Sequence, residues 1–393
     1  MTTLSVFLGI LAMMLSLRYI KDITISLIIA ILAIGMMLLI EPVLYYDAFV
    51  KEVSDWNFWK VMITIFSIYL LGETLNRSGD AARFTSAIGR IFTAPRVAIS
   101  LMPATMGLLP MPGGAMFSAP MVKEMALRDP TITNEDSMVT NYWFRHSMEY
   151  FWPLYPAIVI ASSMANTPLK SMIIGMLPAG IAAIVIGYLY MVRIRPEIKF
   201  SLDALKELLI SSWPIAMVIV LVILNQPGWL VVLAVSLIYL FTKKDRLKIF
   251  KNSLKWKTFF LLLAVFFFKA FVEISHIPET MSNELLSWSV PPVLVIIALP
   301  FIMGMMTGVT QASVGLSFPL LMSLVATQVM FPSALLAYTF AVAGVLLSPV
   351  HLCVALTTQY FSVSYTALVR RIIIPLSVST LVTVCIYFLI VGF

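Results

Sequence analysis

The sequence predicts an all-α polytopic membrane protein made of two inverted repeats, each with a re-entrant hairpin and a broken helix. Of 393 residues, 61% are hydrophobic and 11% are charged, whereas a soluble domain has about 25% charged residues. The mean hydropathy is +0.98. Glycine- and proline-rich stretches interrupt the apolar segments at matching places in the two halves of the chain. This pattern is typical of discontinuous membrane helices.

Apolar segments of roughly 17–25 residues mark the expected membrane spans. Ten spans and two hairpins account for the chain, with a first repeat at residues 1–198 and a second at 203–393. Five crossings in each repeat make the second repeat inverted relative to the first. The expected spans are 4–17, 23–40, 58–75, the broken helix 137–164, 169–192, 208–224, 229–241, 258–274, the broken helix 333–360 and 372–391.

Positive charges test this span count, because Lys and Arg are enriched in cytoplasmic loops. With both termini outside, only Lys51, Lys60 and Lys170 fall on the outer side, while Arg145 and Lys269 lie at membrane depth. The net charge of +7 then reflects cytoplasmic loops. We therefore expect a multi-pass protein of the cell membrane with no nucleic-acid partner.

Two polar segments are expected at the membrane surface. Residues 79–92 alternate polar and apolar side chains at helical spacing, which predicts an interfacial helix. Residues 241–257 are strongly basic and are expected to form a loop that contacts anionic lipid. Lys269 and Glu273 are four residues apart near a span end, so we expect them to pair.

The first hairpin is expected at about 95–127, around the run LLPMPGGAMFSAP. Pro112 lacks an amide proton, and Gly113 and Gly114 allow positive φ, so a helix cannot continue through this run. In lipid, such backbone is tolerated where it lines a wet cavity. We expect Pro112, Gly113, Gly114 and Ser118 to contribute to a binding site.

The second hairpin is expected at about 291–329, where the tip reads TGVTQAS. A half-helix that begins at this tip presents its N-terminal amides, and these favour an anion. Thr310, Gln311 and Ser313 are therefore predicted to bind the same substrate from the opposite side.

The broken helix 137–164 carries three ionisable side chains at membrane depth, Arg145, His146 and Glu149. Such residues are expensive in a bilayer and usually face a cavity or a partner. Two interpretations of Arg145 stay open: a buried ion pair with Glu149 four residues later, or a bidentate contact to an anionic substrate. In the second case His146 or Glu149 carries a coupling proton.

Small polar side chains follow the break in each repeat. Ser162, Ser163 and Asn166 lie on the far arm of the first broken helix, and Thr357 and Thr358 stand at equivalent positions in the second. Their ordinary role is hydrogen bonding between helices. Because the two pairs match, we predict that they complete the substrate site.

The sequence carries no pattern typical of an enzyme. It has no H-E-x-x-H, no G-x-S-x-G, no phosphate loop and no Cys/His metal spacing. We therefore expect neither catalysis nor a cofactor. Cys353 and Cys385 stand in apolar runs and are expected to pack in the core. His351, which closely follows the break at Pro349, is a further candidate site residue.

The architecture and the run LLPMPGGAMFSAP resemble the ion-transporter superfamily, which includes gluconate, citrate and dicarboxylate carriers. Together with YWFRHSMEYFWPLYP at 142–156, the run more narrowly resembles an uncharacterised family of bacterial and archaeal integral membrane proteins within it. The resemblance implies a homodimer with a scaffold and a moving transport domain. It also implies an anionic organic substrate cotransported with sodium or protons.

The tips lack the Ser-Asn-Thr motif of the sodium-dicarboxylate carriers, and the ionisable groups at membrane depth favour protons over sodium. The predicted function is secondary active transport of a small organic anion, a carboxylate, by elevator-type alternating access. The alternatives are a cation/proton antiporter that uses Glu149, a flippase for an anionic lipid head group and, more remotely, an intramembrane enzyme.

Overall fold

The computed structural model describes residues 1–108, 115–192 and 201–392, and within these ranges it contains helices and no strands. Six of the helices are long and apolar enough to cross a membrane. The number rises to seven if the pair Arg246–Ile274 and Ile277–Ser287, bent by 69°, counts as one span. The chain thus has the helices of a multi-pass membrane protein.

The elements follow the expected breaks closely. In the first half they are α1 (Thr2–Ile20), α2 (Ile23–Met37), α3 (Pro42–Ser54), α4 (Trp56–Arg77), α5 (Asp80–Ile91), α6 (Pro95–Gly107), α7 (Ala115–Ala126), α8 (Asn134–His146), the 3-10 turn η1 (Ser147–Tyr150), α9 (Pro156–Met164), α10 (Leu169–Gly187) and the π turn η2 (Tyr188–Val192).

The second half has a similar sequence of elements. They are α11 (Leu202–Ile223), α12 (Gly228–Phe241), α13 (Arg246–Ser253), α14 (Trp256–Ile274), α15 (Ile277–Ser287), α16 (Pro292–Thr307), α17 (Thr310–Leu324), the 3-10 turn η3 (Thr327–Val329), α18 (Met330–Leu346), α19 (Leu352–Phe361) and α20 (Tyr365–Val391).

Side-chain caps fix where several helices begin. Thr133 and Asp136 form a reciprocal capping box at the start of α8, while Asp22 and Asp55 cap α2 and α4. These caps satisfy amide donors that have no partner within the helix. The capping box explains why α8 starts at Asn134, ahead of the expected 137.

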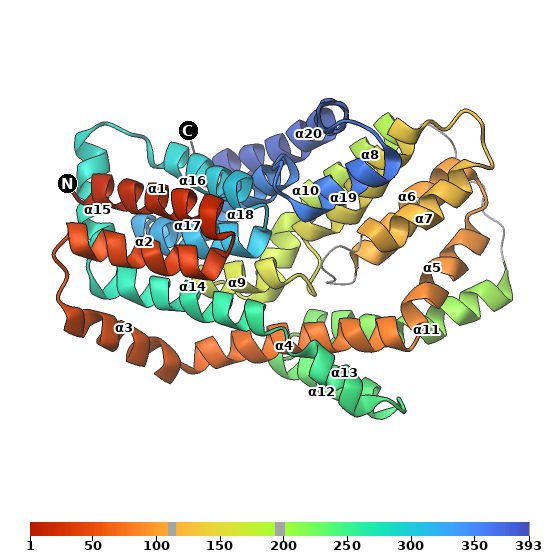
Figure 1. The fold of residues 1–393 in the computed structure, drawn as a ribbon, viewed down its shortest axis with the longest axis horizontal. Coiled ribbons are helices and arrows are strands. Elements are labelled where there is room, and N and C mark those ends of the chain that lie inside the picture. Colours follow the sequence, from red (N-terminus) through yellow and green to blue (C-terminus); the bar gives the residue numbers. More distant parts are fainter. Residues whose placement is uncertain (109–114, 193–200, 393) are drawn as a thin grey trace.

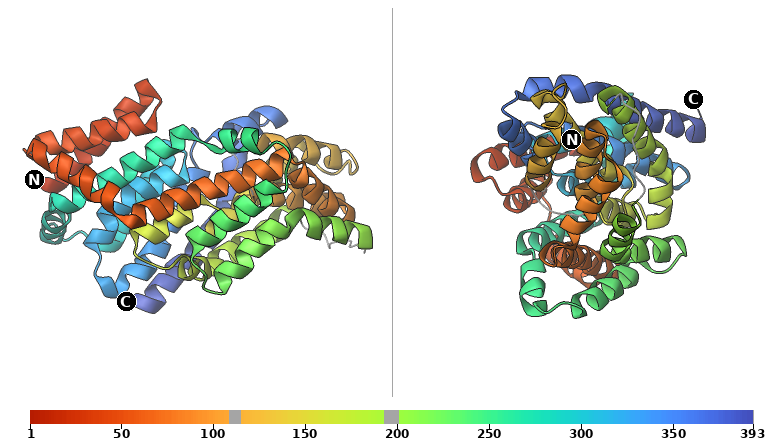
Figure 2. Two further views of the ribbon diagram at one scale, coloured as in Figure 1. Left: turned by 90° about the horizontal axis from the view of Figure 1, so that it is seen from below. Right: turned by 90° about the vertical axis from the view of Figure 1, so that its right-hand side faces the viewer.

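The two predicted hairpins are helix pairs on opposite sides of the broken helices (Figure 1). The pair α6–α7 contacts α8, and the pair α16–α17 contacts α18. Both ends of the molecule's long axis are visible in the left view of Figure 2, with the N-terminal helices at one end and α5–α7 at the other. The broken helices thus lie between the hairpins.

Both predicted breaks are present in the chain. The first separates α8 from α9, with η1 and Pro153 between them, and proline occupies the first position of α9. The second separates α18 from α19 at residues 347–351. Proline has no amide proton and disfavours helical backbone before it, which explains both interruptions.

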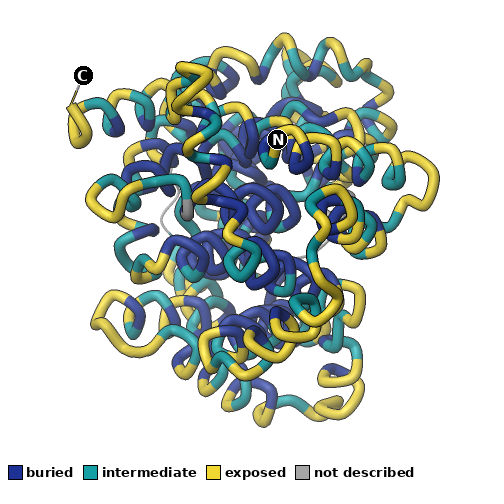
Figure 3. Tube along the Cα trace, turned by 90° about the vertical axis from the view of Figure 1, so that its left-hand side faces the viewer, coloured by how far each residue is buried: buried dark blue, intermediate teal, exposed yellow. Residues whose placement is uncertain are grey.

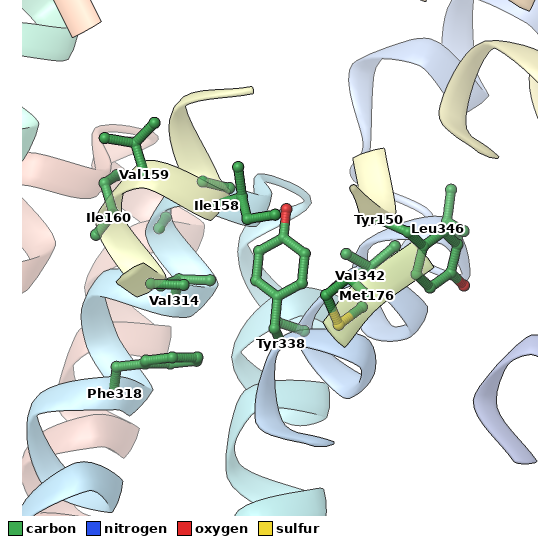
Figure 4. Close-up of a cluster of buried hydrophobic side chains, with 14 of the residues drawn as sticks. Tyr150, Ile158, Val159, Ile160, Met176, Val314, Phe318, Tyr338, Val342 and Leu346 are labelled. Atoms are coloured by element: carbon green, nitrogen blue, oxygen red, sulfur yellow. The ribbon is translucent and has the colours of Figure 1, made fainter. Parts of the chain in front are cut away.

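The core joins helices of the two halves. Buried residues fill the centre of the molecule in Figure 3. Figure 4 shows part of this cluster, where Ile158 and Ile160 of α9 lie beside Val314 and Phe318 of α17, with Tyr338 of α18 close by. In water, burying a large aliphatic or aromatic side chain stabilises a fold by about 1.5–3 kcal/mol. Lipid tails are as apolar as the core, so in a membrane close packing between the helices has to provide the stabilisation instead.

Two helices were not expected from the sequence. α13 lies in the segment predicted to be a basic loop, and α3 lies in a segment predicted to be a connection. Both are short or mixed in polarity, so no apolar run marks them. An ion pair connects α3 to α14, because Lys269 Nζ on α14 lies 3.4 Å from Glu52 Oε2 on α3. The predicted Lys269–Glu273 pair is also present, at 4.0 Å.

Candidate functional site

A cavity of about 320 Å³ lies where the two broken helices meet. Its wall includes the starts of three helices: residues 155–157 at α9, 308–311 at α17 and 350–353 at α19. The last two residues of α8, Arg145 and His146, also line it, and so does Glu149 just after them. Helix N-termini carry partial positive charge, and a helix C-terminus favours cationic side chains. The wall is therefore suited to an anion.

Arg145 is buried, with 4% of its surface exposed. Its Nη1 donates a hydrogen bond to the Met106 carbonyl at the end of α6, at 3.0 Å. A Cβ on the neighbouring Gly107 would lie 2.3 Å from the Arg145 carbonyl oxygen. Only glycine therefore allows α6 to approach α8 closely enough to orient the guanidinium at the cavity wall.

Glu149 connects the two halves of the chain. It lies in η1, between α8 and α9, and its Oε2 accepts a hydrogen bond of 2.9 Å from the Thr310 hydroxyl on α17. Its backbone carbonyl accepts a second hydrogen bond, of 2.7 Å, from the Tyr338 hydroxyl on α18. Its Oε1 lies 3.8 Å from His146 Nε2. The carboxylate is thus positioned by the second half of the chain.

Two histidines face each other across the cavity wall, with 2.9 Å between His146 Nε2 and His351 Nε2. The other ring nitrogen of each contacts a backbone carbonyl. His146 Nδ1 lies 2.9 Å from the Tyr142 oxygen, and His351 Nδ1 lies 2.7 Å from the Gly308 oxygen. Both rings are therefore held by the backbone of a helix end.

Gly308 allows the second contact. It caps α16 with φ +63°, and a Cβ there would lie 2.8 Å from the His351 backbone nitrogen. Left-handed backbone is costly for a residue with a side chain. Both the conformation and the close approach of α16 to the α18–α19 break require glycine.

One group of soft metal-ligand atoms is found in the part of the chain that the structure describes. One ring nitrogen each of His146 and His351 and the Sγ of Cys353 all lie within 4.8 Å of one another. Tetrahedral zinc, with bonds to nitrogen of about 2.0–2.1 Å, separates two nitrogen ligands by about 3.3–3.4 Å. The two ring nitrogens are closer than this, so their separation does not match tetrahedral zinc.

The cavity brings together five of the residues that the sequence predicts. Arg145, His146 and Glu149 come from the first broken helix, and Thr310 and Gln311 come from the start of α17. His351, the further candidate, also lines it.

Two further hairpin candidates, Ser118 and Ser313, lie elsewhere. The Ser118 hydroxyl donates to Asn141 Oδ1 at 2.6 Å, between α7 and α8. The Ser313 hydroxyl donates to the Pro300 carbonyl at 2.7 Å, between α17 and α16. Neither residue is among those that line the cavity. The tip residues Pro112, Gly113 and Gly114 lie outside the described residues, so their role remains a prediction.

The candidates beyond the breaks also stand away from the cavity wall. Ser162 donates to the Thr167 carbonyl at the end of α9, near Ser163 and the exposed Asn166. Thr358 donates to the Val354 carbonyl within α19. Thr357 Oγ1 is buried and has no hydrogen-bond partner among the described residues. These positions are about one and a half to three helical turns from the N-termini that face the cavity.

Sequence reasoning missed several wall residues. Tyr69 on α4 and Thr258 on α14 line the cavity, and Tyr69 accepts a long hydrogen bond of 3.5 Å from Gln311 Nε2. They stand in ordinary apolar spans, so nothing in the sequence marks them.

Cys353 was expected in the core and is buried at the cavity wall, whereas Cys385 is exposed, contrary to expectation.

Comparison with known proteins identifies the family of the chain. The model of a family described as "Protein of unknown function (DUF401)" matches residues 3–391. No curated protein matches the chain. Because the match covers nearly all of the sequence, the chain belongs to the DUF401 family.

Proposed function

We propose that the protein is a secondary active transporter of a small organic anion, a carboxylate, coupled to protons. One observation carries the proposal: three helix N-termini and the buried side chain of Arg145 line a single cavity. Amide groups at helix starts and a guanidinium are the donors that carboxylates prefer. The volume of about 320 Å³ is at the small end of ligand sites.

The proposal includes an architecture. The order of two helices, a long helix, a hairpin, a broken helix and a final helix recurs in each half, which supports two inverted repeats of the ion-transporter superfamily type. Ten crossings require α2, α12 and the broken helix α8–α9 to count as spans in addition to the six long helices and α14. The resemblance extends the proposal to a homodimer in the cell membrane, with a moving domain that carries the cavity between the two sides.

The test is uptake of labelled mono-, di- and tricarboxylates into proteoliposomes under an imposed proton gradient, with and without sodium. Arg145→Lys keeps the positive charge but removes the planar guanidinium, which can donate two parallel hydrogen bonds to one carboxylate. Uptake of the transported anion should therefore fall about tenfold or more. Arg128→Lys is the matched control, because Arg128 is exposed in the loop after α7, and it should transport like the wild type.

Each variant is first checked for a single folded species by size-exclusion chromatography. If no carboxylate enters under either gradient, the proposal of anion transport is wrong. Proton flux driven by a cation alone, without any organic anion, would favour the antiporter instead.

A further inference from the structure

We propose that His146 and His351 together bind one proton between their Nε2 atoms, and that this is the proton coupled to anion transport. The first part depends on the geometry of the two rings. The second part rests on the proposed function.

Hydrogen bonding fixes the protonation of both rings. A carbonyl oxygen only accepts, so His146 Nδ1 must donate to the Tyr142 carbonyl and His351 Nδ1 to the Gly308 carbonyl. In neutral imidazoles this leaves a lone pair on each Nε2. Two lone pairs do not approach to 2.9 Å, whereas an N–H···N hydrogen bond has that length. With both Nδ1 atoms donating, the 2.9 Å contact is the one that an additional proton shared between the rings would make.

The surroundings hold the two rings in this orientation. His146 is 2% exposed, and the Tyr142 ring lies against it with 4.6 Å between ring centroids. The Tyr142 hydroxyl donates to the Leu346 carbonyl at the end of α18. The His351 ring is fixed by Gly308 at the other hairpin. The proton therefore bridges α8 of the first half and the α18–α19 break of the second.

Charged and titratable groups face the pair from several elements. Arg145 on α8 and Glu149 in η1 carry opposite charges, and the Glu149 carboxylate lies 3.8 Å from His146 Nε2. The other titratable groups near the pair are Tyr142, Tyr155, Tyr69 and Cys353, whose thiol contacts the His351 side chain. The thiol is only a weak hydrogen-bond donor, and the two Nε2 atoms remain in direct contact with each other.

The shared proton sets the charge of the cavity wall. With Arg145 and Glu149 both ionised, their charges cancel, and the wall is neutral without the proton and carries one positive charge with it. A monoanion in the cavity then balances that charge, in a buried region where an unbalanced charge is costly. Binding of the proton and of the anion must strengthen each other by the same factor. This reciprocity is what proton-coupled anion transport requires.

Nitrogen NMR tests the proton directly, because the chain has only three histidines. We expect full-length protein labelled with ¹⁵N-histidine in nanodiscs to show scalar coupling between two Nε2 atoms and a protonated Nδ1 on both rings. The coupling should persist in His276→Gln, where an exposed histidine is removed, and in Cys353→Ala. It should disappear in both His146→Gln and His351→Gln.

Wild-type protein with no Nε2–Nε2 coupling at any pH where histidines titrate would overturn the shared proton. Stoichiometric Zn²⁺ that shifts both Nε2 signals, with the shift lost in Cys353→Ser, would also overturn it in favour of a metal site. Proton-driven anion uptake that persists in His351→Gln would overturn the coupling role alone. Coupling between the nitrogens without transport of any carboxylate would refute the proposed function and leave the shared proton intact.

Discussion

Gly308 determines, at the scale of a single residue, where His351 lies. Gly308→Ala adds a left-handed alanine and a Cβ only 2.8 Å from the His351 backbone nitrogen. The strain alone costs about 1–2 kcal/mol, and the contact forces the α16 and α19 ends apart. We expect a lower melting temperature and loss of transport, measured by thermal unfolding in detergent and by uptake.

Gly79→Ala is the matched control for this substitution. Gly79 has φ +76°, and no described atom lies within 4 Å of the place that an alanine Cβ would occupy, so the change adds strain without a contact. It should lower the melting temperature less and leave transport intact. Equal effects of the two substitutions would contradict the role assigned to Gly308.

Thr310 supplies the hydroxyl that orients Glu149. Thr310→Val preserves the shape but removes a hydrogen bond to a charged group, which is worth about 1.5–3 kcal/mol. We expect uptake to fall about tenfold or more. Thr358→Val removes a hydroxyl that donates only within α19 and should have little effect. A large loss in Thr358→Val would instead support the sequence-based prediction that this residue binds substrate.

At the scale of elements, the loop between α7 and α8 fastens the first hairpin. The Thr131 hydroxyl and backbone N–H donate to Asp129 Oδ1 at 2.6 and 2.9 Å, and they hold the pKa of this carboxyl below its usual range. Arg96 at the start of α6 lies 3.7 Å from Asp129 and donates to the Thr131 carbonyl. The charged form of Asp129 is therefore the one that stabilises the hairpin.

This arrangement predicts a pH dependence for Asp129→Asn. A lowered pKa contributes stability above the unfolded-state value of about 3.9, and that contribution is lost as the pH falls through the folded-state pKa. The variant should melt below the wild type at neutral pH, and the two melting temperatures should converge in acid. A difference that is constant with pH would show that Asp129 acts by packing and not by charge.

At the scale of the whole molecule, local chemistry made much of the architecture predictable. Prolines and glycines marked both breaks, and the apolar length marked the long helices. The charged residues of the first broken helix marked Arg145, His146 and Glu149 as one wall of the cavity. In each case a single segment contained the whole signal.

What could not be predicted depends on contacts between distant segments. The pairing of His146 with His351 joins residues 205 positions apart, and neither local sequence specifies the other. Tyr69 and Thr258 line the cavity only because α4 contacts α9 and α14 contacts α17. Ser162 and Thr358 share their chemistry with substrate-binding residues, but their hydroxyls donate to nearby carbonyls of their own segments.

The central claim is that one cavity, built by both halves of the chain, binds an anion together with a proton. Proton influx into proteoliposomes that contain a pH-sensitive dye tests it most directly. Adding the transported carboxylate outside should acidify the lumen in wild type and in His276→Gln, but not in His146→Gln or His351→Gln. Carboxylate entry without any acidification in the wild type would contradict the claim.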